Sequence, residues 1–223
     1  MTATLDEVYL RLRTAYGPQD WWPGESPFEI MVGAVLVQNT AWKNVKRAIE
    51  NLRDAELLTL QALGTVPQEE LEELIRPAGY FRLKARRLRN LLEYVQESCD
   101  NSLEVMFAKD TASLREDLLN INGIGPETAD SILLYAGDKK VFVVDTYTNR
   151  ILKRHGWIDY EADYHQIQDH FEANVRDDVA MYNEYHALLV RVGHLHCRKT
   201  PTCDECPLAD LLPEGGVQEP PWG

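Results

Sequence analysis

Hydrophobic and polar positions recur at helical spacing along almost the whole chain. Residues 28–52 are apolar on most faces as far as Gln38 and amphipathic beyond it, which predicts one central helix. Residues 81–98 place a leucine stripe under a basic face. The same spacing predicts helices over residues 67–80, 111–125, 126–137, 146–157, 163–175 and 179–196. Residues 139–145 are apolar enough for a strand but equally consistent with an extended segment, so the pattern predicts an all-α protein.

The composition limits the class of protein but does not indicate its activity. The 223 residues are 44% hydrophobic, enough to bury a core in one domain or two small lobes. No run of eighteen apolar residues exists, and the first residues lack the basic flank and apolar core of a signal peptide. We therefore expect no membrane partner and a cytoplasmic protein. Residues 213–223 are rich in proline and glycine, which predicts a disordered tail.

The distribution of charge is uneven. A formal net charge of -13 argues against a non-specific nucleic-acid binder, which usually carries a basic surface. One local exception lies within eight residues and consists of Arg82, Lys84, Arg86, Arg87 and Arg89. Taken alone, such a run is typical of a solvated helix face, and it indicates polyanion binding only together with other features.

The stretch "INGIGPETAD", residues 121–130, predicts a helix–hairpin–helix. A helix ends at Ile121, and a second begins at Pro126. Gly123 and Gly125 allow a tight turn and a close approach of the backbone to a ligand. The N–H groups that open the second helix favour an anion. An ordinary helix corner with a glycine cap fits this stretch equally well, whereas a dinucleotide-binding loop fits poorly because a third glycine is missing.

Four motifs in order resemble the HhH-GPD DNA glycosylase superfamily, and in particular its endonuclease III-like members. They are "VLVQNT", "GYFRLKARRL", "GIGPETAD" and "VVDTY", and the resemblance extends from about Trp21 to Cys206. It implies a two-lobed all-α fold with a DNA-binding cleft between the lobes. Residues 27–138 would form a six-helix domain with the hairpin at about 118–136. Residues 1–26 and 139–212 would form a second helical domain that ends in a cysteine-rich loop at 197–206.

The resemblance also implies roles for individual residues. Asp145 inherits the role of the essential aspartate, and Gln38 that of the side chain that fills the gap left by a flipped nucleotide. The partner would be double-stranded DNA containing a damaged base, bound by a monomer on the bacterial nucleoid. The expected contacts to DNA phosphates come from Gly123, Gly125, Lys84, Arg86 and Arg87.

Glu127 stands where lyase-competent members of the superfamily carry a lysine. Without that amine no Schiff base forms at this position, so the resemblance implies an enzyme that removes a base and leaves the abasic site intact. Three motifs most resemble those of the endonuclease III-like 3-methyladenine DNA glycosylases. They are "WWP", "GAVL" before "QNT", and "GIG" before "PETAD". A cationic methylated purine stacks well on electron-rich rings. The candidate base pocket consists of Trp21, Trp22 and Trp42, for which ordinary core packing is the competing interpretation.

Two other functions stay open at this point. The first is an endonuclease III-like glycosylase for oxidised or mismatched pyrimidines. The second is a non-catalytic DNA-binding module that keeps the hairpin and has no base pocket. An aspartate beside a phosphate-binding hairpin disfavours the module, because a carboxylate repels phosphates.

Three cysteines crowd into ten residues: Cys197, Cys203 and Cys206. The resemblance implies a [4Fe–4S] loop, but the first gap is one residue short and Leu212 occupies the expected fourth position. Three thiolates are incomplete for such a cluster. His194 or His196 is a candidate fourth ligand, and three cysteines with one histidine also suit zinc. An iron–sulfur cluster, zinc and a metal-free loop therefore all remain open.

Overall fold

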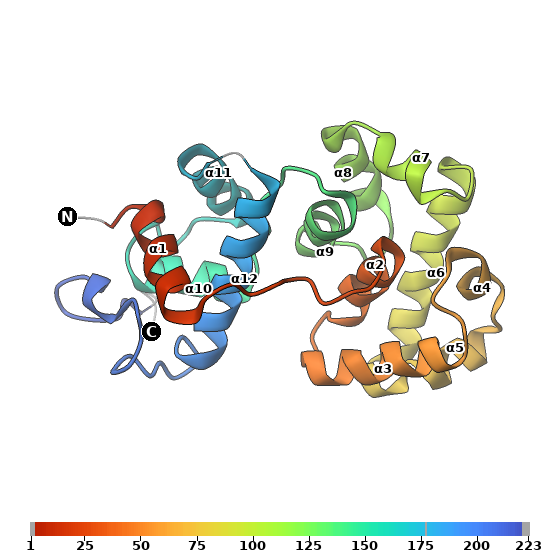
Figure 1. Ribbon diagram of the computed structural model, residues 1–223, viewed down its shortest axis with the longest axis horizontal. Helices are drawn as coiled ribbons and strands as arrows, with labels where there is room; N and C mark the ends of the chain where they lie inside the picture. The colour runs from red at the N-terminus through yellow and green to blue at the C-terminus, as the bar shows by residue number, and fades with distance from the viewer. Residues whose placement is uncertain (1–2, 177, 220–223) are drawn as a thin grey trace. The chain divides into compact units, whose positions relative to one another are not determined.

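The computed structural model describes residues 3–176 and 178–219, and this part of the chain contains helices and no β-strand (Figure 1). The predicted all-α fold is confirmed. The chain divides into two compact units, one formed by Trp22–Lys139 and the other by the residues before and after it. The resemblance implied divisions at 26/27 and 138/139, whereas the structure has them at 21/22 and 139/140. No helix in the described ranges has the length and apolar character of a membrane span.

The Trp22–Lys139 unit is built around α2 (Pro27–Leu36), in which every residue from Phe28 to Leu36 is buried. Ser26 caps this helix by accepting a hydrogen bond from the backbone N–H of Glu29 at 3.2 Å. The unit also contains α3 (Trp42–Asp54), α4 (Leu60–Thr65), α5 (Gln68–Leu74), η1 (Arg76–Ala78), α6 (Phe81–Ser98), α7 (Leu103–Ala108), α8 (Thr111–Asn120), α9 (Pro126–Ser131) and η2 (Ile132–Ala136).

The prediction of one helix over residues 28–52 was wrong. The chain leaves α2 after Leu36 and re-enters a helix at Trp42, with Asn39 in the left-handed region at φ 53°. Asparagine tolerates this conformation better than most residues. The ammonium group of Lys84 on α6 donates to Leu36 O at 2.8 Å and thereby satisfies a carbonyl at the helix end. The apolar spacing continues through the break, so periodicity alone could not show it.

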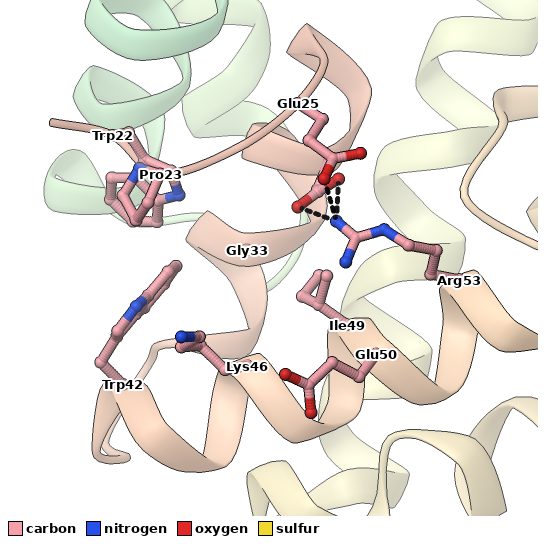
Figure 2. Close-up of a pocket in the computed structure, with 10 residues that line it drawn as sticks. Trp22, Pro23, Glu25, Gly33, Trp42, Lys46, Ile49, Glu50 and Arg53 are labelled. Atoms are coloured by element: carbon pink, nitrogen blue, oxygen red, sulfur yellow. Dashed lines mark hydrogen bonds and ion pairs between the residues drawn. The ribbon is translucent and has the colours of Figure 1, made fainter. Parts of the chain in front are cut away.

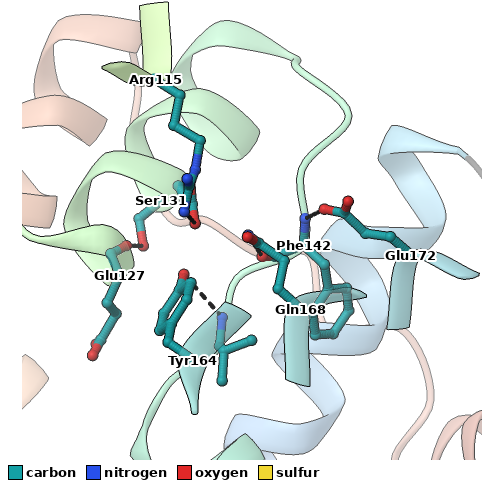
Figure 3. A network of polar contacts seen from close by, with 9 residues as sticks. Arg115, Glu127, Ser131, Phe142, Tyr164, Gln168 and Glu172 are labelled. Atoms are coloured by element: carbon teal, nitrogen blue, oxygen red, sulfur yellow. Dashed lines mark hydrogen bonds and ion pairs between the residues drawn. The ribbon is translucent and has the colours of Figure 1, made fainter. Parts of the chain in front are cut away.

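The two helices of the predicted hairpin are α8 and α9, and a buried ion pair joins them. Arg115 donates from Nε and Nη2 to the two carboxylate oxygens of Asp130 at 2.6 and 3.0 Å (Figure 3). Asp130 is fully buried, and the two parallel hydrogen bonds from Arg115 fix the relative orientation of the two side chains. The N-cap of α8 is Asp110, whose carboxylate accepts hydrogen bonds from two backbone N–H groups.

The second unit contains α1 (Leu5–Tyr16), α10 (Thr146–Arg154), α11 (Tyr164–Asn174), α12 (Val179–Leu195) and η3 (Ala209–Leu211). The segment before α10, which the sequence left open, is not part of a β-strand, and the described residues provide no strand to pair with it. Side chains of α11 bind its backbone instead: Phe142 N donates to Glu172 at 2.8 Å, and Gln168 donates to Phe142 O at 2.6 Å (Figure 3). The ring of Phe142 stacks on Phe171 at 3.9 Å. These contacts fix the backbone that leads to Asp145.

The predicted disordered tail falls only partly within the described residues. Residues 213–219 form turns and bends, and Gln218 N donates to Arg154 O at 2.9 Å. This bond attaches the segment to the end of α10. Residues 220–223 lie outside the described part of the chain.

Candidate functional site

Asp145 is the N-cap residue of α10. Its Oδ1 accepts a hydrogen bond from the backbone N–H of Thr148 at 2.7 Å, and its side chain is 12% exposed. The N-terminus of a helix favours negative charge, so the first turn of α10 stabilises the carboxylate in a fixed orientation. The sequence motif indicated this aspartate but gave no sign that it would cap a helix. The result is a nearly buried, oriented carboxylate.

Tyr147, in the first turn of α10, packs directly against α12. A Cβ atom at Gly193 would lie 2.5–2.6 Å from the side chain of Tyr147, so only glycine allows this approach. The guanidinium of Arg150 lies 5.2 Å from the centre of the Tyr147 ring. Tyr147 therefore fastens α10, which begins at Asp145, to α12.

The turn of the hairpin is held by side chains from elsewhere in its unit. Gln38 donates from Nε2 to Gly123 O at 3.1 Å and to Thr128 Oγ1 at 2.9 Å. The guanidinium of Arg87 donates to Gln38 Oε1. Gly123 has φ 96°, and a Cβ there would lie 2.4 Å from Arg87 Cγ. The turn thus requires glycine for its backbone conformation and for the close approach of Arg87.

The basic run separates into internal and exposed members. Lys84 is 1% exposed and donates to Leu36 O and Ala78 O, both at 2.8 Å. Burial lowers the pKa of Lys84 to about 8. Arg89 donates to Leu63 O at 2.8 Å, and burial lowers its pKa as well. Arg86 is exposed. In this structure Lys84 therefore offers no ammonium to a DNA phosphate, whereas Arg86 remains available to one.

The three candidate tryptophans do not form a single sandwich. Trp21 and Trp22 are half-buried and belong to different compact units. The rings of Trp22 and Trp42 meet edge to face, with centroids 5.1 Å apart at 87°. A base held between parallel rings needs them roughly 7 Å apart, at two van der Waals contacts. Trp22 also lies 5.3 Å from the ring of Tyr135. Trp22 and Trp42 therefore leave no slot between them, and both line the same pocket.

A pocket of about 330 Å³ opens beside these two rings (Figure 2). That volume is within the range of small-molecule sites in proteins. Arg53 lines the side of the pocket away from the tryptophans, donates to both carboxylate oxygens of Glu29 at 2.9 Å and lies 3.5 Å from Glu25. Its other lining residues are Trp22, Pro23, Gly33, Trp42, Lys46, Ile49 and Glu50. The lining carries three carboxylates against two cations, so it suits a flat ring with partial or full positive charge.

The cysteine-rich loop is organised by arginine side chains of α10. Arg154 donates to Arg198 O at 2.6 Å and Lys199 O at 2.9 Å, and its Nη1 lies 3.6 Å from Cys197 Sγ. Arg150 donates to Cys197 O at 2.6 Å. A charged guanidinium thus holds the backbone carbonyls at one side of the thiols.

The residues present do not fit a four-ligand metal centre. The three cysteines line a cavity of only about 10 Å³, and Leu212, in the expected fourth position, lines it too. Burial raises the pKa of the Cys203 and Cys206 thiols. Within the described ranges, no group of three or more His, Cys, Asp or Glu side chains is arranged to hold a metal ion.

Comparisons with known proteins identify similar sequences and a matching family model. A family model described as "HhH-GPD superfamily base excision DNA repair protein" matches residues 32–177. A relative from Methanocaldococcus jannaschii, whose name assigns it to the DNA repair glycosylases, is 48% identical over 92% of this chain and 94% of its own length. Endonuclease III of Sulfolobus acidocaldarius is 28% identical over 82% of this chain and 80% of its own length.

Solved structures of DNA repair enzymes are also similar to this chain. The 3-methyladenine DNA glycosylase of H. pylori, bound to 1,N6-ethenoadenine, has a TM-score of 0.76 and 30% identity, covering 86% of this chain and 98% of its own. A trapped endonuclease III–DNA covalent intermediate has a TM-score of 0.80 at 22% identity, covering 96% and 98%, and shares the fold. The chain belongs to the HhH-GPD superfamily of base excision DNA repair proteins, and it is a DNA glycosylase of that superfamily.

Proposed function

We propose that this chain is a monofunctional glycosylase that hydrolyses the N-glycosidic bond of alkylated purines such as 3-methyladenine in double-stranded DNA, acting as a monomer. The observation that carries the proposal is Asp145, a nearly buried carboxylate fixed by Thr148 N at the start of α10. An oriented negative charge of this kind stabilises positive charge that develops on a bound sugar.

The leaving base and the carboxylate have separate roles in the proposed reaction. A 3-methylated adenine is a cation, so it takes the electron pair of the breaking C1′–N bond and leaves as a neutral base. Asp145 stabilises the oxocarbenium-like sugar, as one carboxylate does in glycoside hydrolysis. Water then forms the new C1′–O bond and releases a proton to the solvent. No acid catalyst is required for a leaving group that already carries positive charge.

The absence of lyase chemistry is part of the proposal and depends on Glu127. This residue lies in the first turn of α9 and is exposed, at the position where the superfamily's lyases carry a lysine. Lys84 has a lowered pKa but is buried and donates to two carbonyl groups, so it cannot attack a sugar. Water is therefore the nucleophile, and the product is an intact abasic site.

The choice of base is supported by the pocket beside Trp22 and Trp42. Its aromatic faces and acidic lining favour a cationic ring, with a cation–π contribution of roughly 0.5–2 kcal/mol. The similarity to the H. pylori enzyme, solved with a modified adenine, points to the same substrate class. Trp21, in the other unit, stays a candidate for the same role.

The DNA-contacting surface that we propose combines the hairpin with neighbouring exposed groups. Gly123 and Gly125 bring backbone N–H groups to the surface, and Arg86 supplies an exposed cation. The amide of Gln38 is engaged by the hairpin and by Arg87. Asn39 and Tyr80 are exposed, and each has a positive φ. Lys84 donates to Leu36 O and Ala78 O, which are carbonyl groups of the turns that carry these two residues. We therefore propose that Asn39 and Tyr80 enter the distorted duplex while Gln38 holds the hairpin.

The decisive experiment is release of free bases from duplex DNA, measured by chromatography. Methylated DNA should yield 3-methyladenine and abasic sites that break only after alkali treatment. Trp42→Ala should reduce excision more than it reduces binding to undamaged duplex. Release of thymine glycol or of thymine from G·T pairs, without release of methylated purines, would replace this substrate with a pyrimidine. Salt-sensitive binding without release of any base would show a non-catalytic module.

A further inference from the structure

His186 lies in the interior of α12, close to the carboxylate of Asp145. The side chain is buried, with 4% of the residue exposed. Its Nε2 is 4.0 Å from Asp145 Oδ2. The ring of Phe142 meets the imidazole edge to face at 6.4 Å, so an aromatic side chain from the extended segment limits its movement. Neither the sequence pattern nor the resemblance indicated this residue.

The two oxygens of Asp145 have different surroundings. Oδ1 accepts the backbone N–H of Thr148 at 2.7 Å, which fixes that oxygen to α10. Oδ2 faces the imidazole of α12. At 4.0 Å the two groups attract each other electrostatically without a direct hydrogen bond. Hydrogen bonds in catalytic sites are often long in the free enzyme and shorten when substrate binds.

We propose that His186 is a positioning residue for Asp145. The neutral imidazole of His186 faces Oδ2 and thereby fixes the plane of the carboxylate. This inference rests on the proposed function, in which Asp145 faces the developing charge of the sugar. One hydrogen bond to Oδ1 still leaves the carboxylate some freedom about χ2, which is a broad torsion. A second contact from α12 removes that freedom, and Tyr147 against Gly193 keeps the two helices in register.

The protonation state of His186 agrees with this role. Burial lowers the pKa of His186, and the nearby charge of Asp145 opposes the shift. A neutral imidazole can donate one N–H to a carboxylate and leaves its negative charge uncompensated. A protonated imidazole would form an ion pair with Asp145 and weaken its interaction with a cationic sugar. The contact thus orients the carboxylate without neutralising it.

Single-turnover excision from methylated duplex tests the proposal with three variants. His186→Leu removes the polar contact and should lower the excision rate at saturating enzyme by roughly 10- to 100-fold, with unchanged affinity for DNA. His186→Asn keeps a side-chain donor and should recover most of that loss. His155→Asn is the matched control, since His155 is also buried but binds Ile151 O at 2.8 Å, and it should retain the wild-type rate. Equal rates for wild type and folded His186→Leu overturn the proposal.

A second measurement does not depend on glycosylase activity. Titration of the imidazole of His186 by NMR in the full chain should show its pKa falling further in Asp145→Asn, because the variant removes the charge that raises it. An unchanged titration overturns the contact even if both His186 variants fail to fold. A wild-type enzyme that releases no alkylated purine, combined with this shift, overturns the proposed function and leaves the Asp145–His186 contact in place.

Discussion

The carboxylate of Asp145 and the backbone N–H of Thr148 are joined by a hydrogen bond of 2.7 Å, so one residue both begins α10 and supplies the candidate catalytic charge. These two roles are separable by substitution, because asparagine caps helices about as well as aspartate but carries no charge.

Asp145→Asn should therefore lose activity while keeping stability. We expect base excision to fall by at least about 10²-fold, the usual effect of removing a charge-stabilising group. The free energy of unfolding should change by less than about 0.5 kcal/mol, whereas Asp145→Ala should also lose the cap and about 1 kcal/mol. Urea denaturation and single-turnover excision measure both quantities. Wild-type excision by the asparagine variant contradicts the catalytic assignment.

Glu127→Lys should introduce the amine that the first turn of α9 lacks. Borohydride should then trap a covalent complex with DNA that wild type does not form. A lysine in the first turn opposes the helix dipole, so we expect a loss of about 0.3–1 kcal/mol in stability. Glu127→Gln is the control and should trap nothing. Trapping by the wild-type protein contradicts the proposed monofunctional chemistry.

Substitutions at the two hairpin glycines should have unequal effects. Gly123→Ala places a Cβ 2.4 Å from Arg87 Cγ at φ 96°, so we expect a loss of roughly 1–3 kcal/mol in unfolding free energy. Gly125→Ala is the matched control, since φ is -97° and a Cβ there meets no atom within 4 Å. Its stability should stay within about 1 kcal/mol of wild type. Chemical denaturation of both variants decides the point, and equal losses contradict the close packing of Arg87 on the turn.

Lys84 should make stability depend on alkaline pH. Its pKa is about 8 in the folded protein against 10.5 when unfolded, so above pH 8 the unfolded state binds more protons. The contribution of Lys84 to stability should therefore rise between pH 8 and 10.5, by up to about 1.4 kcal/mol per pH unit. Urea denaturation of wild type and Lys84→Met should show a difference that grows across this range. A constant difference means that Lys84 titrates at the ordinary value.

The cysteine-rich loop should depend on Arg154 rather than on a metal. We expect purified protein to contain no stoichiometric iron or zinc by mass spectrometry, and chelators to leave its thermal midpoint unchanged. Arg154→Ala removes two charge-assisted bonds to Arg198 O and Lys199 O and should cost about 3 kcal/mol. A visible absorption band of an iron–sulfur cluster, lost together with the fold on chelation, contradicts this interpretation.

Local chemistry in the sequence was sufficient for the helical fold and for the two helices that flank the glycine turn, whereas the hairpin followed from the resemblance. Pro126 after a glycine-containing turn marked the start of α9, and apolar spacing marked α6 and α12. The break at residues 37–41 was missed because the ammonium that satisfies Leu36 O comes from Lys84, 48 residues further along the chain. Periodicity reports which face of a helix is buried and carries no information about a distant side chain that ends it.

The candidate site divides in the same way. The sequence by itself determined which residue types are present: the aspartate of "VVDTY", the glutamate in place of a lysine, and three cysteines without a fourth. Only the tertiary structure decided that Lys84 is internal, that Gln38 is engaged by the hairpin and that His186 faces Asp145. These facts depend on burial and on distances between elements far apart in the chain. They are fixed by packing, which one-dimensional patterns do not record.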